Sequence, residues 1–198
     1  METAVKVDGR RARGLRTRDA IVGALMALVA EGDLSPTAQR IADRAGVSVR
    51  SVYQHFTDVE GLFLETAART SAWLAEVAVD IDPTWPLERR VDAFVTERSS
   101  VLEGLTPFSR ASRLIEPHSE ALRQSRLEIE RKGRDELQRV FAPELTAMDP
   151  AERPSVLGVL DLLTTWSAWD HLRNSGAGIA TARRVMRAGL LALLAPRA

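Results

Sequence analysis

The sequence predicts an all-α protein of about nine helices arranged in two domains. Three observations support this prediction. Apolar residues recur three and four positions apart along most of the chain, which is the period of an α-helix. No stretch of the 198 residues shows the strict alternation of a half-buried strand, an internal repeat or a low-complexity run. The stretch 37–56 has the pattern of two short helices joined by a tight turn, a helix-turn-helix.

The helix-turn-helix is the most informative stretch of the chain. Its first helix places three apolar side chains on the inner face: Ile41, Ala42 and Ala45. Gly46 supplies the turn, because glycine adopts a positive φ at little cost. Ser48 is expected to cap the second helix with its hydroxyl. That helix, about 48–55, turns Val52 and Phe56 inward and leaves mostly hydrogen-bonding side chains on the surface, where they suit phosphates and base edges.

The other helices follow from the same periodicity, with proline and glycine between them. The segment 1–16 is basic and is expected to be disordered, either as a solubilising tail or as an arm that contacts DNA. We expect residues 1–60 to hold this arm and the helix-turn-helix domain, and residues 61–198 to form a helical effector-binding and dimerisation domain. The expected helices cover residues 17–31, 37–45, 48–55, 59–79, 87–105, 108–114, 119–141, 155–174 and 179–194.

Composition excludes several classes of protein. The chain has no cysteine, which excludes a disulfide framework and a Cys-based zinc site, and its three histidines are far apart in sequence. Phosphate-binding glycine loops, dinucleotide fingerprints and nucleophile elbows are absent, so we expect no enzyme, no catalytic residue, no metal and no cofactor. No apolar run is long enough for a membrane span, and the charged N-terminus lacks a signal-peptide core, so a cytoplasmic location is expected. The formal net charge is zero, so any affinity for DNA must come from local basic patches.

The region 17–65 resembles the DNA-binding domain of TetR-family transcriptional regulators. The matching elements are Glu31-Gly32, Thr37, Ile41-Ala42, Ala45-Gly46-Val47-Ser48, Val52-Tyr53, His55-Phe56, Glu60 and Leu62-Phe63. The resemblance implies a homodimer that binds a palindromic operator, usually represses, and releases DNA when a small molecule enters the C-terminal domain. One position departs from the family pattern: Val59 stands where the family often carries a lysine that contacts a phosphate.

Eight residues are candidates for DNA binding: Thr37, Gln39, Ser48, Val49, Arg50, Ser51, Tyr53 and His55. Arg50 suits a bidentate contact with guanine, and Val49 a contact with a thymine methyl group. Gln39 is either a base-reading residue or a solvated helix residue. Thr37 combines a hydroxyl with free backbone amides at a helix N-terminus, which suits a phosphate. The resemblance implies phosphate contacts for the remaining hydroxyl and imidazole groups at positions 51, 53 and 55.

The candidate effector residues are less well defined. There are six candidates. Four are aromatic, Trp73, Phe94, Phe108 and Trp166, and two lie near the proline-broken segment at Pro117, Arg113 and His118. They suit an apolar pocket with a few polar groups. The alternatives are a plain core or a dimer interface for the aromatic residues, and a solvated surface for Arg113 and His118.

The last two predicted helices carry small residues among Leu, Val and Met. Small residues allow helices to approach closely, so two such helices per subunit suit a four-helix bundle about a two-fold axis. Alternatively they complete a monomeric core. The sequence therefore predicts a ligand-responsive DNA-binding regulator, most simply a homodimeric repressor released from operator DNA by a small molecule. The alternative is a helical small-molecule-binding or catalytic protein that retains an unused helix-turn-helix domain.

Overall fold

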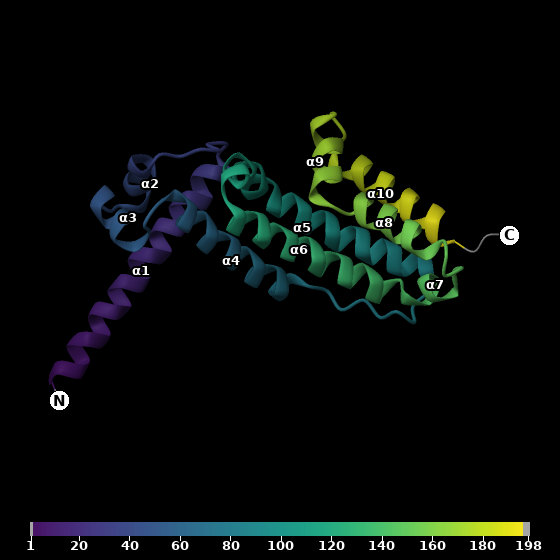
Figure 1. Cartoon of the computed structure of the whole chain (residues 1–198), viewed down its shortest axis with the longest axis horizontal. Helices are drawn as coiled ribbons and strands as arrows, with labels where there is room; N and C mark the ends of the chain where they lie inside the picture. The colour runs from purple at the N-terminus through teal and green to yellow at the C-terminus, as the bar shows by residue number, and fades with distance from the viewer. Residues whose placement is uncertain (1, 196–198) are drawn as a thin grey trace. The chain divides into compact units, whose positions relative to one another are not determined.

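The computed structural model describes residues 2–195, with the side chains of residues 2–8 and 10 left undescribed. Within this range the chain forms α-helices and one short 3-10 helix, and no strand (Figure 1). The predicted all-α class is confirmed. The helices are α1 Glu2–Ala30, α2 Ala38–Ala45, α3 Val49–His55, α4 Val59–Val77, α5 Leu87–Ile115, η1 Glu116–His118, α6 Glu120–Val140, α7 Ala142–Ala147, α8 Arg153–Leu163, α9 Trp166–Asn174 and α10 Ile179–Leu194.

The chain divides into two compact units. The first comprises residues 1–71 and 107–125, and the second comprises residues 72–106 and 126–198. Residues 61–71 and 107–125, which we expected in the C-terminal domain, are grouped with the helix-turn-helix. Helices α4, α5 and α6 each contribute one part to each unit.

The core of the first unit is built by α1, α2, α3, the start of α4 and the adjoining parts of α5 and α6. Helix α1 supplies an apolar face of which Ile21 and Leu25 are completely buried, and α2 packs against this face through Ile41. The ring of Phe63 is also completely buried, and it stacks on Phe108 with 5.7 Å between ring centroids. These contacts join residues far apart in sequence into one apolar cluster, which holds the short helices α2 and α3 in place.

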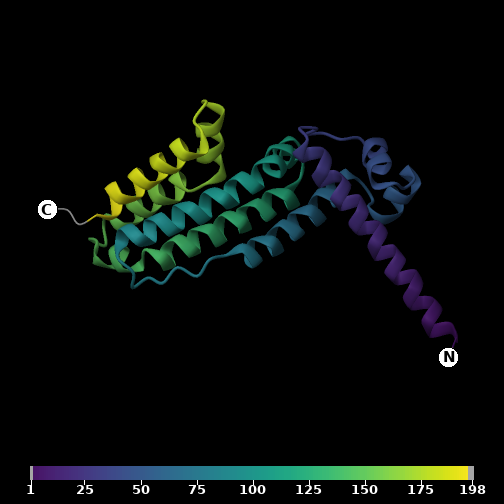
Figure 2. The same ribbon diagram turned by 180° about the vertical axis from the view of Figure 1, so that it is seen from behind.

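The second unit is a helical bundle in which α5, α6, α8, α9 and α10 contribute side chains to one apolar core (Figure 1). Phe94 of α5 meets Phe141 edge to face at a centroid distance of 5.4 Å. Trp169 of α9 is completely buried, and its indole Nε1 donates to Glu103 at 2.7 Å. The segment 78–86, seen from behind in Figure 2, is an extended connection whose Ile81 side chain is completely buried in this core.

Several predicted helix boundaries were wrong. Residues 2–16, expected to be disordered, continue α1, since most of them are good helix formers. Helix α5 was expected to end before Pro107, but it continues to Ile115 with the proline inside it. The loss of one backbone donor there is tolerated because both flanks of the helix are buried in core clusters.

The predicted helix 155–174 is in fact two helices. The Thr164 hydroxyl donates to the carbonyl of Leu160 at 3.0 Å, and the Thr165 hydroxyl accepts from the amide of Ala168 at 3.3 Å, so Thr165 caps a new helix. Consecutive threonines thus offer the backbone alternative hydrogen bonds and end α8. The segment 142–147, expected to be part of a connection, forms α7. The predicted bounds of the last helix, 179–194, are confirmed.

Candidate functional site

The helix-turn-helix forms through local hydrogen bonds. The Thr37 hydroxyl accepts from the amide of Arg40 at 3.3 Å and caps α2. Gly46 ends α2 with φ of 66°, and its amide donates to the carbonyls of Ala42 and Asp43. A residue with a side chain is strained at this φ, which explains the glycine. The Ser48 hydroxyl then accepts from the amide of Ser51 at 3.1 Å and caps α3, as predicted.

Helix α3 has one buried face and one exposed face. Val52 and the C-terminal cap residue Phe56 are buried. Arg50 is exposed, and Tyr53 has 54% of its surface exposed although it is aromatic. Within the described residues, Arg50 has neither an ion pair nor a hydrogen bond to a side chain. An unpaired guanidinium beside an exposed phenol gives this face donors for a phosphate or a base edge.

The other predicted DNA-binding residues surround this face. Ser51, Val49 and His55 are half-buried, while Thr37, Gln39 and Ser48 are exposed on the segment that precedes α3. The amide nitrogen of Gln39 donates to Asp43 at 2.8 Å, which holds that side chain along α2. Arg44 of α2 pairs with Glu31.

Arg18 of α1 holds the end of α3 in place. Its guanidinium donates to the carbonyl of His55 at 3.1 Å and to Glu65 of α4 at 2.8 Å, and it lies over the Phe56 ring at 4.5 Å. The hydrogen bond from Arg18 holds the pKa of Glu65 below its ordinary value. Arg18 therefore fixes the position of the end of α3. Sequence analysis missed it because its partners lie 37 and 47 residues away.

The start of helix α4 is fixed by contacts within the first unit. The carboxylate of Asp58 accepts from the amide of Gly61 at 2.8 Å at the start of α4. Val59 is half-buried and packs against the core of the first unit. Glu60 accepts a hydrogen bond from the hydroxyl of Ser119, which is buried and also caps the start of α6 through the amide of Leu122. The start of α4 is thus tied to the start of α6 within the first unit.

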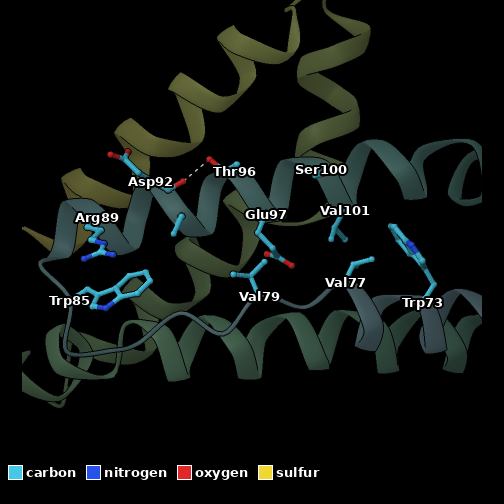
Figure 3. Close-up of a pocket in the computed structure, with 11 residues that line it drawn as sticks. Trp73, Val77, Val79, Trp85, Arg89, Asp92, Thr96, Glu97, Ser100 and Val101 are labelled. Carbon is cyan, nitrogen blue, oxygen red and sulfur yellow. Dashed lines mark hydrogen bonds between the residues drawn. The ribbon is translucent and has the colours of Figure 1, made fainter.

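The second unit contains a pocket of about 630 Å³ between the end of α4, the extended segment 78–86 and α5 (Figure 3). This volume lies in the range of pockets for small organic molecules. The pocket is lined by Trp73, Val77, Val79, Trp85, Arg89, Asp92, Ala93, Thr96, Glu97, Ser100 and Val101. Trp73 and Trp85 lie at opposite ends in Figure 3, and Glu97 lies between them.

Of the six predicted effector residues, Trp73 lines this pocket. Phe94 instead points into the core, completely buried, and the Trp166 indole donates to the hydroxyl of Thr106 at 3.1 Å. Phe108, Arg113 and His118 belong to the first unit. Aromatic residues were predicted to line the pocket, but most of these side chains fill the cores.

Glu97 is the pocket residue that sequence analysis missed. It lies on an α5 face whose neighbours one turn away are uncharged, Ala93, Ser100 and Val101, and a charge in such a stripe is the signal that could have identified it. Burial raises the pKa of Glu97 from 4.5 to about 7, and the nearby carboxylate of Glu136 adds to this effect. The group therefore titrates near neutrality.

The raised pKa of Glu97 predicts a pH-dependent stability. The folded chain holds this proton up to about pH 7, whereas the unfolded chain releases it near pH 4.5, so stability falls as pH rises between these values. Glu97→Gln cannot ionise, and its melting temperature should exceed that of the wild type increasingly from pH 5 to pH 8. Calorimetry at several pH values measures this difference. Glu76→Gln, which removes an exposed carboxylate of α4, is the control, and an equal response of both variants would contradict the assignment.

Helices α8 and α10 present an exposed face of small and apolar residues. They pack closely, because a Cβ on Gly189 would lie 2.7 Å from Leu163 Cδ1 and only glycine fits there without a shift. On the outside of the pair, Val159, Leu162 and Val185 are exposed with 44%, 62% and 42% of their surfaces. Gly158, Ala188 and Ala192 are exposed between them.

Among the described residues, no group of three or more Asp, Glu or His side chains is arranged to hold a metal ion. In the same range, no helix is both long enough and apolar enough to cross a membrane.

The chain is similar to known proteins in part of its sequence and in its fold. Residues 21–66 match the family model described as bacterial regulatory proteins, tetR family. This match covers the C-terminal part of α1, all of α2 and α3, and the first part of α4. No curated protein matches the chain in a sequence search.

Several solved structures are similar over most of their length. A transcriptional regulator from Rhodococcus sp. RHA1 aligns with 20% identity and a TM-score of 0.67, over 89% of this chain and 95% of its own. A protein from Vibrio parahaemolyticus assigned to the TetR family of transcriptional regulators aligns with 20% identity and a TM-score of 0.58, over 87% and 96%. One from Mesorhizobium loti with the same assignment gives 20% and 0.55, over 92% and 97%. At this identity the likeness shows a shared fold.

Proposed function

We propose that this chain, which belongs to the tetR family of bacterial regulatory proteins by its N-terminal domain, is a homodimeric transcriptional repressor released from its operator by a small molecule. The observation that carries the proposal is the exposed face of α3. A capped helix of seven residues presents Arg50 and Tyr53 to solvent, while Val52 and Phe56 anchor it to the core. Such a helix fits the major groove of DNA. The proposed location of this regulator is the cytoplasm.

The proposed contacts divide into two kinds. Arg50 and Val49 read bases, and Gln39 reaches a base edge from α2 if it leaves Asp43. Ser51, Tyr53 and His55 hold phosphates, and the N-termini of α2 and α3 add the amides beside Thr37 and Ser48. The phosphate contacts position the helix, and the base contacts select the sequence.

Dimerisation is proposed through the exposed face of α8 and α10. Val159, Leu162 and Val185 form an apolar surface, and the neighbouring glycine and alanine residues let a second pair of helices approach closely. Two pairs related by a two-fold axis form a four-helix bundle. This arrangement places two α3 helices on a palindrome, at a required separation of about 34–36 Å or a multiple of it.

Release by a ligand is proposed to act through α4. Residues 59–71 of this helix belong to the first unit and residues 72–77 to the second, so one continuous helix begins in the unit of α3 and ends at the pocket. Trp73 and Val77 line the pocket from this end. A ligand that contacts them favours one position of α4, and a change in the spacing of the recognition helices then weakens DNA binding.

Selection of bound fragments from a random DNA pool tests the function. We expect enrichment of a palindromic sequence with half-sites about one helical turn apart, bound by the dimer. Adding candidate small molecules should then release the DNA. A selection that enriches no sequence would instead favour the alternative, a ligand-binding helical protein whose helix-turn-helix is unused.

Val59→Lys tests the placement of α4 beside the DNA backbone. A lysine there adds one phosphate contact per subunit, so the slope of log affinity against log salt should steepen by about 1.8 for a dimer. Sequence preference should stay the same, because phosphate contacts carry no sequence information. Since Val59 is half-buried, we expect a loss of unfolding free energy of no more than about 1 kcal/mol. Titrations at several salt concentrations measure the slope, and an unchanged slope would place residue 59 away from the backbone.

A further inference from the structure

The pocket of the second unit has the shape of a site for an elongated, mainly apolar ligand. The Trp73 indole packs over Gly104, where a Cβ would lie 3.0 Å from its Cη2 atom, and it forms one end. Trp85 forms the other end, and its ring is covered by the Arg89 guanidinium at 3.9 Å. Val77, Val79 and Val101 line the space between them. A ligand with an aromatic or aliphatic body therefore finds apolar surface along this pocket.

The polar feature of this apolar space is the carboxylate of Glu97. Its Oε2 atom is buried and has no hydrogen-bond partner within the described residues. Figure 3 shows the side chain directed from α5 toward the segment that carries Val79. A buried acceptor without a donor costs free energy, so a ligand that supplies the donor recovers it.

The cations near Glu97 have other partners, although the buried Nε of Arg98 donates to none of the described residues. The Arg98 guanidinium donates to Glu136 at 2.7 Å and to the carbonyl of Gly133 at 3.2 Å. Arg89 is stacked on Trp85, and the other pocket carboxylate, Asp92, accepts from Arg187 at 2.6 Å. Glu97 therefore lies beside a second carboxylate, Glu136, with a cation that is shared with that neighbour. The guanidinium of Arg98 donates to Glu136 and not to Glu97, so a cationic ligand can supply the donor that Glu97 Oε2 lacks.

We propose that this pocket binds an amphipathic organic amine, whose ammonium group donates to Glu97 and whose apolar body lies against Trp73 and the valines. The assignment of this amine as the effector rests on the function proposed above. An ammonium supplies both the missing donor and the missing charge, and the exposed indole of Trp73 adds a face that attracts cations. A neutral alcohol supplies only the donor. A carboxylate is repelled by Glu97 and Glu136.

The proposal predicts a characteristic pH dependence. An alkyl ammonium keeps its charge up to about pH 10, as lysine does, whereas Glu97 ionises near pH 7. The amine binds the ionised carboxylate, so affinity should rise as pH increases through 7. The ionised fraction rises about tenfold from pH 6 to pH 8, and affinity should rise by about the same factor. The charged groups around Glu97 are Glu136, Arg98, Arg89 and Asp92. Each of these four groups has a charged or aromatic partner in the structure.

Three probes of equal length test the ligand class: phenylbutylamine, phenylbutanol and phenylbutyrate. Calorimetric titration of the full-length protein at pH 8 should give the highest affinity for the amine. Glu97→Gln should weaken amine binding about tenfold or more and leave the alcohol within about twofold. Asp92→Asn is the matched control, because Asp92 lines the same pocket but is paired with Arg187, and it should leave amine binding within about twofold. Because Glu97→Gln changes a buried group, its melting temperature at pH 8 is measured to check that the variant is folded.

The outcomes separate this inference from the proposed function. Equal amine affinity in wild type and Glu97→Gln, or tighter binding of phenylbutyrate, overturns the ligand class. An amine affinity of the wild type that does not change between pH 6 and pH 8 overturns it as well, without any variant. If the amine binds through Glu97 but leaves DNA affinity unchanged, the ligand class stands and the effector role fails. If a different molecule releases DNA while the amine does not bind, the proposed function stands and this inference fails.

Discussion

Leu162→Glu is expected to convert the protein to a monomer that binds operator DNA weakly. Leu162 has 62% of its surface exposed on α8, between Val159 and the end of the helix, so its replacement removes no core contact. In the proposed dimer the new carboxylate is buried against the symmetric helix and lacks a partner, a cost of several kcal/mol. Sedimentation at micromolar concentration should show the mass of one chain, 21.8 kDa, where the wild type shows twice that mass.

Loss of the dimer removes the second half-site contact. Because linked binding modules gain about 10²–10⁴ in affinity over single ones, operator affinity should fall by a factor of this order. Leu114→Glu is the control: Leu114 is equally apolar, has 56% of its surface exposed and lies in the first unit. It should leave the dimer intact. A Leu162→Glu protein that remains a dimer would exclude the α8 and α10 face as the interface.

Arg50→Ala is expected to relax base preference at one position in each half-site. A bidentate contact from arginine to guanine is worth about 1–3 kcal/mol, so the two half-sites together lose about 2–6 kcal/mol on the preferred operator. Affinity for random DNA should change far less. Competition titrations with operators substituted at single positions measure this selectivity.

Two matched variants separate base reading from phosphate binding. Tyr53→Phe removes one exposed hydroxyl from the same helix and should weaken binding to all sequences alike. Arg44→Ala removes an arginine of α2 that already pairs with Glu31, and it should have little effect on either quantity. If Arg50→Ala instead lowers affinity for all sequences equally, Arg50 binds a phosphate and another residue reads the base.

The elements that the sequence predicts well are those formed by local interactions. The Thr37 and Ser48 caps and the positive φ of Gly46 each depend on atoms within a few residues, so their residue types identify the helix-turn-helix directly. The last helix, which begins after Gly178, was predicted for the same reason. Period and capping determined the fold class and the recognition helix without reference to the rest of the chain.

The tertiary structure decided what depends on distant partners. Pro107 was expected to end a helix, yet burial on both sides keeps α5 continuous through it. Arg18 holds the end of α3 because the fold brings the His55 carbonyl and the Glu65 carboxylate to its guanidinium. Most of the aromatic residues chosen for a pocket fill cores instead, and Glu97 lines a pocket that forms where α4 and the segment 78–86 cover α5. Sequence by itself determined the all-α class and the exposed face of α3, because these follow from local spacing. The pocket and its unpaired carboxylate arise from packing between segments that no local pattern records.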